Sequence, residues 1–126
     1  MPSTPLTNPR VYAPGADITA VASTAVTGRR FVAISGNRSG GNLSVAHATA
    51  AGRKFGVAKH DAAAGALVGV ARDGVVWVRA AGTIAAFAEV EVGASGQVVA
   101  KSAGVAVGYA VTGAASGADA EIVLYP

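Results

Sequence analysis

The sequence LVGVARDGVVWVR, residues 67–79, places two runs of β-prone residues on either side of an Asp-Gly step. Asp-Gly between such runs is the strongest short-range signal of a β-hairpin, because both residues tolerate the positive φ angles of a tight turn. We therefore predict strands over 67–71 and 75–79 that pair with each other. Trp77 lies between two valines and is predicted to fill the core rather than to act as a ligand platform.

The same pattern continues through the chain, where short Val- and Ala-rich runs alternate with Gly-centred turns. Apolar residues at period two, bounded by turns about every 8–12 residues, are typical of a small sandwich or barrel. The predicted fold class is therefore all-β with little helix. Residues 35–42 are expected to form a loop, and 47–54 and 61–65 a turn or short helix each. Further strands are expected over 17–26, 31–34, 43–46, 55–58, 89–92, 98–100, 105–111 and 121–124.

A chain of 126 residues is expected to form one domain with a real core. We assign residues 17–126 to a single β body. Because Ala and Val dominate, a thinly filled core of this kind favours extra stability from self-association. The large side chains expected to fill the core are Phe31, Phe55, Trp77, Phe87 and Tyr109.

Residues 1–16 differ from the body, because a proline recurs every few residues. Each proline restricts its own φ and moves the preceding residue toward extended geometry, which excludes helix and disfavours a central strand. We interpret the segment as an extended arm that docks on another surface; a frayed terminus without a role is the alternative. The arm residues expected to make contact are Pro5, Leu6, Pro9, Val11 and Tyr12.

Charge is distributed unevenly along the chain, whose net charge is +3. Residues 1–60 contain seven basic residues and one acidic residue, a net +6, whereas residues 61–126 contain three basic and six acidic residues, a net −3. Such asymmetry indicates a partner-facing side or ordinary solvated charge. Arg10, Arg29 and Arg30 are the candidates for electrostatic contacts. Aromatic residues are not interleaved with the basic ones, which argues against specific nucleic-acid binding.

Few residues carry reactive chemistry. The chain has no cysteine and two histidines, so no metal site is expected. The chain has no G-x-S-x-G elbow to accompany His47 or His60. A small hydrolase that uses either histidine is therefore the third and weakest functional hypothesis. The Gly-rich residues 36–42 lack the Gly-Lys-Ser/Thr ending of a phosphate-binding loop. Glu89 and Glu91 are interpreted as a solvated strand face rather than a catalytic pair. We predict no catalytic residue and no cofactor.

The sequence also bears on the compartment. No apolar run approaches the about 20 residues needed to span a bilayer, so no membrane partner is expected. The N-terminal residues lack the apolar core of a secretory signal, and the absence of cysteine fits a reducing compartment. We therefore expect the protein to be made in the cytoplasm.

The second half of the chain carries an ordered series of short motifs. They read FGVAKHDAAAG at 55–65, VGVA at 68–71, GVVWV at 74–78, AGTIAA at 81–86, VEV at 90–92, GYAVTGAASG at 108–117 and AEIVL at 120–124. In this order the motifs resemble the capsid decoration, or cement, proteins of tailed bacteriophages, a family of small proteins rich in Ala, Gly and Val.

The resemblance implies a barrel-like or tulip-like domain that binds the outside of the expanded capsid, as a trimer at three-fold and quasi-three-fold positions. It implies the major capsid protein as partner, an arm that adds a strand to a capsid-protein loop, and stabilisation against the pressure of packaged DNA. The location is then the virion surface, after synthesis in the host cytoplasm. The alternative is a virion accessory β module that binds carbohydrate or a host surface, which requires exposed aromatic residues.

Overall fold

The structure is a computed structural model that describes residues 9–12 and 14–126. In this part of the chain, ten β-strands form two five-stranded sheets, and the one helical segment is the 3₁₀ turn η1 (Ala94–Gly96). The first sheet contains β1 (Asp17–Ala22), β2 (Phe31–Ser39), β3 (Asn42–His47), β4 (Gly56–Ala58) and β5 (Leu67–Ala71). The second contains β6 (Val75–Arg79), β7 (Glu89–Val92), β8 (Val98–Ala100), β9 (Gly108–Ala110) and β10 (Asp119–Leu124). The predicted all-β class is confirmed.

The first sheet closes into a barrel in the strand order β1-β3-β2-β4-β5. Its strands pair antiparallel except for β1 and β3, which run parallel. Side chains alternate across each strand, and small ones suit the narrow interior of a barrel with few strands. The side chains buried in this core include Ala20, Ala22, Val32, Val45, Val68 and Val70.

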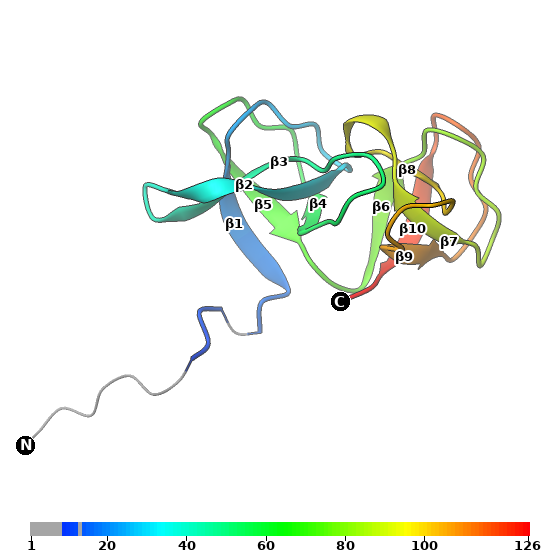
Figure 1. Cartoon of the computed structure of the whole chain (residues 1–126), viewed down its shortest axis with the longest axis horizontal. Helices are drawn as coiled ribbons and strands as arrows, with labels where there is room; N and C mark the ends of the chain where they lie inside the picture. Colours follow the sequence, from blue (N-terminus) through cyan, green and yellow to red (C-terminus); the bar gives the residue numbers. More distant parts are fainter. Residues whose placement is uncertain (1–8, 13) are drawn as a thin grey trace, which may run out of the picture.

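The second sheet lies beside the barrel (Figure 1) and has the strand order β6-β10-β9-β7-β8. A bridge between Ala80 and Val98 connects the end of β6 with β8, so the sheet curls around its inner face. Phe31 of the barrel strand β2 is fully buried in the core of the second sheet, so the two sheets share this core. The inner face of the second sheet contributes Val78, Val90, Val92, Val98 and Ile122.

The Asp73-Gly74 step does not form the predicted hairpin. β5 pairs with β1 and β4 of the barrel, whereas β6 pairs with β10 of the second sheet. Of the two turn residues only Gly74 has a positive φ, +80°, so the step lacks the geometry of a type I′ turn. Both strands have the predicted bounds, but tertiary pairing places them in different sheets.

Of the five predicted core residues, only Phe31 is fully buried; Phe55 is half-buried against the barrel core, and Tyr109, Trp77 and Phe87 point to the outer side of the second sheet. Trp77 is 54% exposed and Phe87 is 81% exposed. The side chains of Trp77 and Phe87 point away from the core, which is therefore filled mainly by Val, Ile and Phe31.

The remaining local predictions are modified by long-range contacts. The predicted loop over 35–42 is short, because β2 continues to Ser39 before turning at Gly40 and Gly41. His47 ends β3, and residues 48–54 and 61–65 form turns and irregular segments rather than helix. No helix within the described residues has the length and apolarity needed to cross a membrane.

Gly56 lies in β4, where the barrel leaves no room for a side chain. A Cβ atom there would lie 2.5 Å from the carbonyl oxygen of Ala71 and 2.5 Å from Cγ1 of Val70. We expect Gly56→Ala to lower the free energy of unfolding by about 1–3 kcal/mol, the usual effect of overpacking. Gly36→Ala in β2 is the matched control, since nothing lies within 4 Å of its Cβ position. Urea denaturation measures both variants, and equal stabilities would contradict this packing.

Candidate functional site

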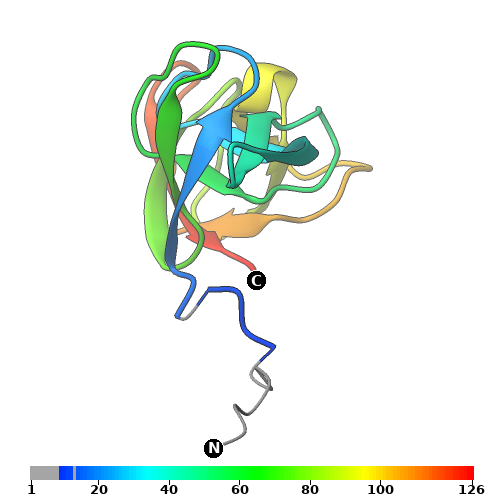
Figure 2. The same cartoon turned by 90° about the vertical axis from the view of Figure 1, so that its left-hand side faces the viewer.

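The arm is one candidate contact surface. Of its predicted contact residues, Pro5 and Leu6 lie outside the described part of the chain, whereas Pro9, Val11 and Tyr12 are described and exposed. Val11 is 73% exposed and Tyr12 is 40% exposed. The described arm residues project away from the two sheets (Figures 1 and 2). The arm is therefore placed to meet another surface.

The base of the arm is attached to the barrel at two points. The carbonyl oxygen of Ala16 accepts a hydrogen bond of 2.8 Å from the backbone N–H of Arg72. The hydroxyl of Tyr12 accepts a hydrogen bond of 3.2 Å from Arg38, whose guanidinium lies 5.8 Å from the centre of the tyrosine ring. Arg38 belongs to β2, so the Tyr12 contact orients the arm relative to the β2–β3 hairpin.

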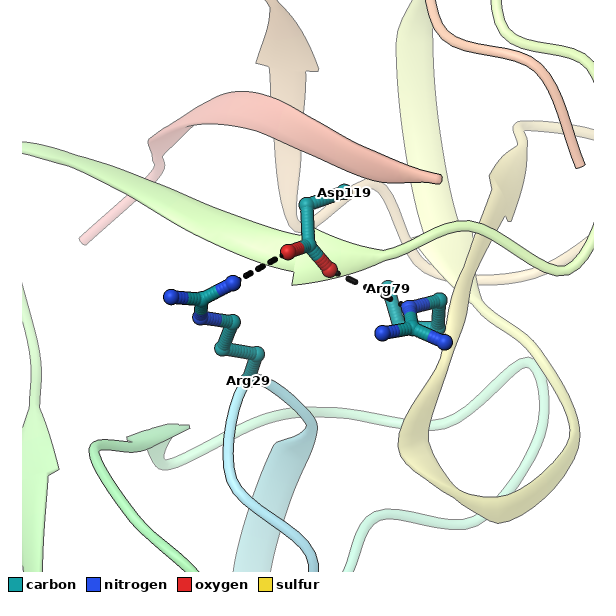
Figure 3. A network of polar contacts seen from close by, with 3 residues as sticks. All are labelled: Arg29, Arg79 and Asp119. Carbon is teal, nitrogen blue, oxygen red and sulfur yellow. Dashed lines mark hydrogen bonds and ion pairs between the residues drawn. The ribbon is translucent and has the colours of Figure 1, made fainter. Parts of the chain in front are cut away.

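Arg29 takes part in a charge network between the two sheets. Its guanidinium pairs with Asp119 of β10, which also accepts a hydrogen bond of 3.1 Å from Nε of Arg79 in β6 (Figure 3). The backbone N–H of Arg79 donates to the carbonyl oxygen of Arg29 at 2.9 Å. The loop before β2 is thereby connected to two strands of the second sheet.

The Asp119 carboxyl is held in its charged form by this network. Burial by itself raises the pKa of Asp119, but the hydrogen bonds and positive charges of Arg79 and Arg29 outweigh that effect and lower it. The other candidate cations differ in their surroundings. Arg30 donates a hydrogen bond of 3.1 Å to the carbonyl oxygen of Ser95, and Arg10 is an exposed residue of the arm.

The outer face of the second sheet is unusually apolar. Strand pairing aligns its outward side chains in two rows, and exposed apolar residues in such a contiguous arrangement mark interaction surfaces. The apolar members Val75, Trp77, Val111 and Phe87 are between 43% and 81% exposed. The first row is Val75, Val123, Tyr109 and Glu89. The second row is Trp77, Glu121, Val111 and Phe87.

Phe87 is the most exposed large apolar residue of this outer sheet face. It has a φ of +67°, which is strained for a bulky side chain. Its ring packs edge-on against Tyr109 with 5.5 Å between centroids, and Tyr109 lies 6.1 Å from Tyr125. The Tyr125 hydroxyl donates a hydrogen bond of 2.9 Å to Glu89, which raises the pKa of Tyr125. These contacts hold the aromatic cluster in a defined arrangement.

Sequence reasoning missed the outer sheet face, although the signal was present. In the strand 75–79, Trp77 lies two residues before the exposed Arg79 and next to the buried Val78. Because alternate strand residues point to opposite faces, Trp77 should have been assigned to the charged, outward face. Arg29 lies 5.2 Å from the centre of its ring and covers part of it.

Both histidines bind backbone groups. Nε2 of His47 accepts a hydrogen bond of 2.9 Å from the N–H of Thr27, and Nε2 of His60 accepts one of 3.2 Å from the N–H of Gly69. Burial, followed by the charge of Arg30, lowers the pKa of His47. Neutral His47 therefore acts as an acceptor that fastens the loop before β2.

The predicted solvated pair of glutamates is wrong for one member. Glu89 is exposed, but Glu91 is 7% exposed and accepts hydrogen bonds from the backbone N–H groups of Ser102 and Gly104. The loop after β8 folds over Glu91, which is why the alternation along β7 did not predict its burial. Its role is to bind that loop.

A β body with an apolar outer face and an exposed arm is typical of a protein that acts by contact with other macromolecules. The chain belongs to the phage cement protein family, whose model matches residues 12–125. Among solved structures it is similar to the head fiber gp8.5 N base of bacteriophage phi29. That match has 25% identity and a TM-score of 0.75, and covers 86% of this chain and 92% of that chain. No curated protein matches.

These matches confirm the resemblance to phage cement proteins. The chain is accordingly a structural phage protein with a capsid-associated decoration role, and a component of the virion.

The Asp119 network should make stability depend on pH. Because the folded-state pKa of Asp119 lies below its usual value of about 3.9, its stabilisation is present above that value and is lost as the pH falls through the folded pKa. We expect Asp119→Asn to cost about 1 kcal/mol at pH 7 and progressively less below pH ~4. Urea denaturation between pH 2.5 and 7 measures this, with Asp73→Asn in the exposed turn as control. A pH-independent difference would contradict the assignment.

The exposure of Trp77 can be measured directly, because it is the only tryptophan in the chain. We expect acrylamide to quench its fluorescence efficiently in the folded protein, with a modest further increase on unfolding. A folded protein that is protected from acrylamide would place Trp77 in the core and would contradict the outer sheet face.

Proposed function

We propose that this protein binds the outer surface of the expanded phage capsid through its N-terminal arm, with the major capsid protein as partner. In this proposal it assembles as a trimer at three-fold and quasi-three-fold positions and reinforces the shell against the pressure of packaged DNA. The observation that carries the proposal is the cement-family match over residues 12–125, combined with an arm whose exposed residues 9–12 lie at and just before the start of that range. The proposal assigns no catalysis to the chain.

The arm suits strand addition to a capsid-protein loop. Main-chain hydrogen bonds provide most of the affinity in that binding mode, so few specific side chains are needed. Exposed Val11 and Tyr12 supply apolar contacts, and prolines reduce the entropy lost when the arm becomes ordered. Three arms on one trimer would add avidity, because the first bound arm raises the effective concentration of the others.

The outer sheet face suits the contact between copies. Residues 17–72 contain seven basic and two acidic residues, a net +5, whereas residues 73–126 contain two basic and five acidic residues, a net −3. A head-to-tail ring places the second sheet of one copy against the barrel of the next, which brings opposite charges together. The contact would cover Trp77 and Phe87, the two exposed aromatic anchors.

A second candidate function is a virion module that binds carbohydrate or a host surface. The exposure of Trp77 and Phe87 favours it, since such binding requires accessible aromatic rings. The edge-on packing of Phe87 on Tyr109 is less suited to a flat sugar-stacking platform. Trp77→Ala and Phe87→Ala separate the two functions: loss of the trimer supports the subunit contact, and loss of sedimentation with host cell walls supports the second candidate.

Co-sedimentation with expanded, undecorated shells of the cognate phage tests the proposed function. We expect saturable binding by the full chain. Residues 15–126 should bind more weakly by about tenfold or more, because each arm of the trimer increases the overall affinity by raising the effective concentration of the others. Unchanged thermal unfolding of the truncated chain is the control. Tight binding without the arm would remove the arm mechanism, and absence of binding by the full chain would refute the capsid role.

A further inference from the structure

A cleft separates the barrel from the end of the second sheet. It consists of two adjoining hollows that share Arg53 and Lys54, one of about 500 Å³ and one of about 140 Å³. The larger is lined on the barrel side by Ala33, Ile34, Thr49, Gly52 and Phe55. The smaller is lined on the second-sheet side by Val105, Ala106, Val107, Tyr125 and Pro126. We call this concave surface the Arg53–Lys54 cleft.

Arg53 and Lys54 make the Arg53–Lys54 cleft cationic, and no Asp or Glu side chain is among its lining residues. Nζ of Lys54 donates a hydrogen bond of 2.6 Å to the carbonyl oxygen of Tyr125, which brings the ammonium into the cleft. Behind it, Arg72 lies 4.4 Å from the centre of the Phe55 ring. Within the described chain, no salt bridge to a carboxylate neutralises Arg53, Lys54 or Arg72.

This arrangement has an electrostatic cost that an anion would relieve. Burial, followed by the repulsion from Arg72, lowers the pKa of Lys54. Here Lys54 is held by the carbonyl oxygen of Tyr125, and Arg72 by the carbonyl oxygen and the ring of Phe55, so these two charges are preorganised.

We propose that the Arg53–Lys54 cleft binds an acidic, extended segment of the capsid protein, as a second contact beside the arm. This proposal rests on the proposed function. Acidic side chains match Arg53 and Lys54, while Ile34 at 49% exposure and Val105 at 47% exposure offer apolar contacts on either side. Two hollows in series accommodate an extended segment better than a single compact ligand.

The charge of the cleft argues against the chain's own arm as the occupant. Residues 1–16 contain Arg10 and no acidic residue, so an arm from a neighbouring copy would be repelled. The arm and the cleft therefore call for different segments of the partner. Together they would hold each copy at two points and resist rotation on the shell.

The cleft is tested first with a soluble probe that does not depend on capsid binding. We expect an acetylated decapeptide of alternating Glu and Val to shift the amide NMR signals of Thr49, Gly52 and Phe55 in the full chain. A Lys–Val peptide of the same length should not, and Arg53→Glu should abolish the response to the acidic peptide. Shifts no larger in the cleft than elsewhere, or tighter binding there of single-stranded DNA, would overturn the proposal.

Shell binding then tests the partner. Arg53 makes no hydrogen bond or ion pair with another described residue, so Arg53→Glu should fold normally. We expect it to weaken binding to undecorated shells about tenfold or more, with a reduced salt dependence. The matched control Lys101→Glu makes the same charge change at an exposed site outside the cleft and should bind within about twofold of the unmodified chain.

The outcomes separate the two proposals. If Arg53→Glu and the unmodified chain bind shells equally, the proposed binding of a capsid-protein segment in the cleft is wrong, while the proposed capsid binding of the protein is unaffected. Failure of the unmodified chain to bind shells refutes the proposed function, and the peptide titration still decides whether the cleft recognises acidic segments. A cross-link from benzoylphenylalanine at Thr49 to an acidic capsid-protein segment supports the assignment, whereas a cross-link to a second copy of this chain overturns it.

Discussion

The shared apolar core around Phe31 is the interaction on which the rest of the structure depends. Phe31 belongs to the barrel strand β2, yet it is fully buried in a cluster with Val92 and Val98 of the second sheet. Full burial of such a side chain contributes about 1.5–3 kcal/mol. Gly96, with a φ of +73°, lets the turn after β7 approach the Phe31 backbone where a Cβ would clash. The two sheets are therefore held in one arrangement.

Each surface with functional potential follows from that arrangement. The inner face of the second sheet is used for the core, so its outer rows of Trp77, Phe87 and their neighbours remain available for contact. The barrel and the second sheet meet beside Arg53 and Lys54, which creates the cationic cleft at their junction. On another part of this junction, Arg29 and Arg79 converge on Asp119. A small β protein can thus offer several distinct binding surfaces.

The sequence predicted the class of fold and most strands, because period-two Val and Ala patterns and Gly-centred turns are local signals. The bounds of β5, β6, β7 and β8 agree with expectation. Strand partners were not predictable in the same way: the Asp73-Gly74 step has the local signature of a hairpin but connects two sheets. The predicted contacts of Pro5 and Leu6 lie outside the described residues, and those of the rest of the arm stay predictions.

The sequence by itself determined the all-β character and the resemblance to phage cement proteins, and it predicted a separate arm, because composition, motif order and proline spacing are properties of the linear chain. Tertiary structure decided that Trp77 faces outward, that Glu91 is buried, and that Arg53 and Lys54 share a cleft with the end of the chain. These features depend on which segments meet across the two sheets. These tertiary contacts depend on the combined burial and hydrogen bonding of residues far apart in the sequence, which local sequence patterns do not predict.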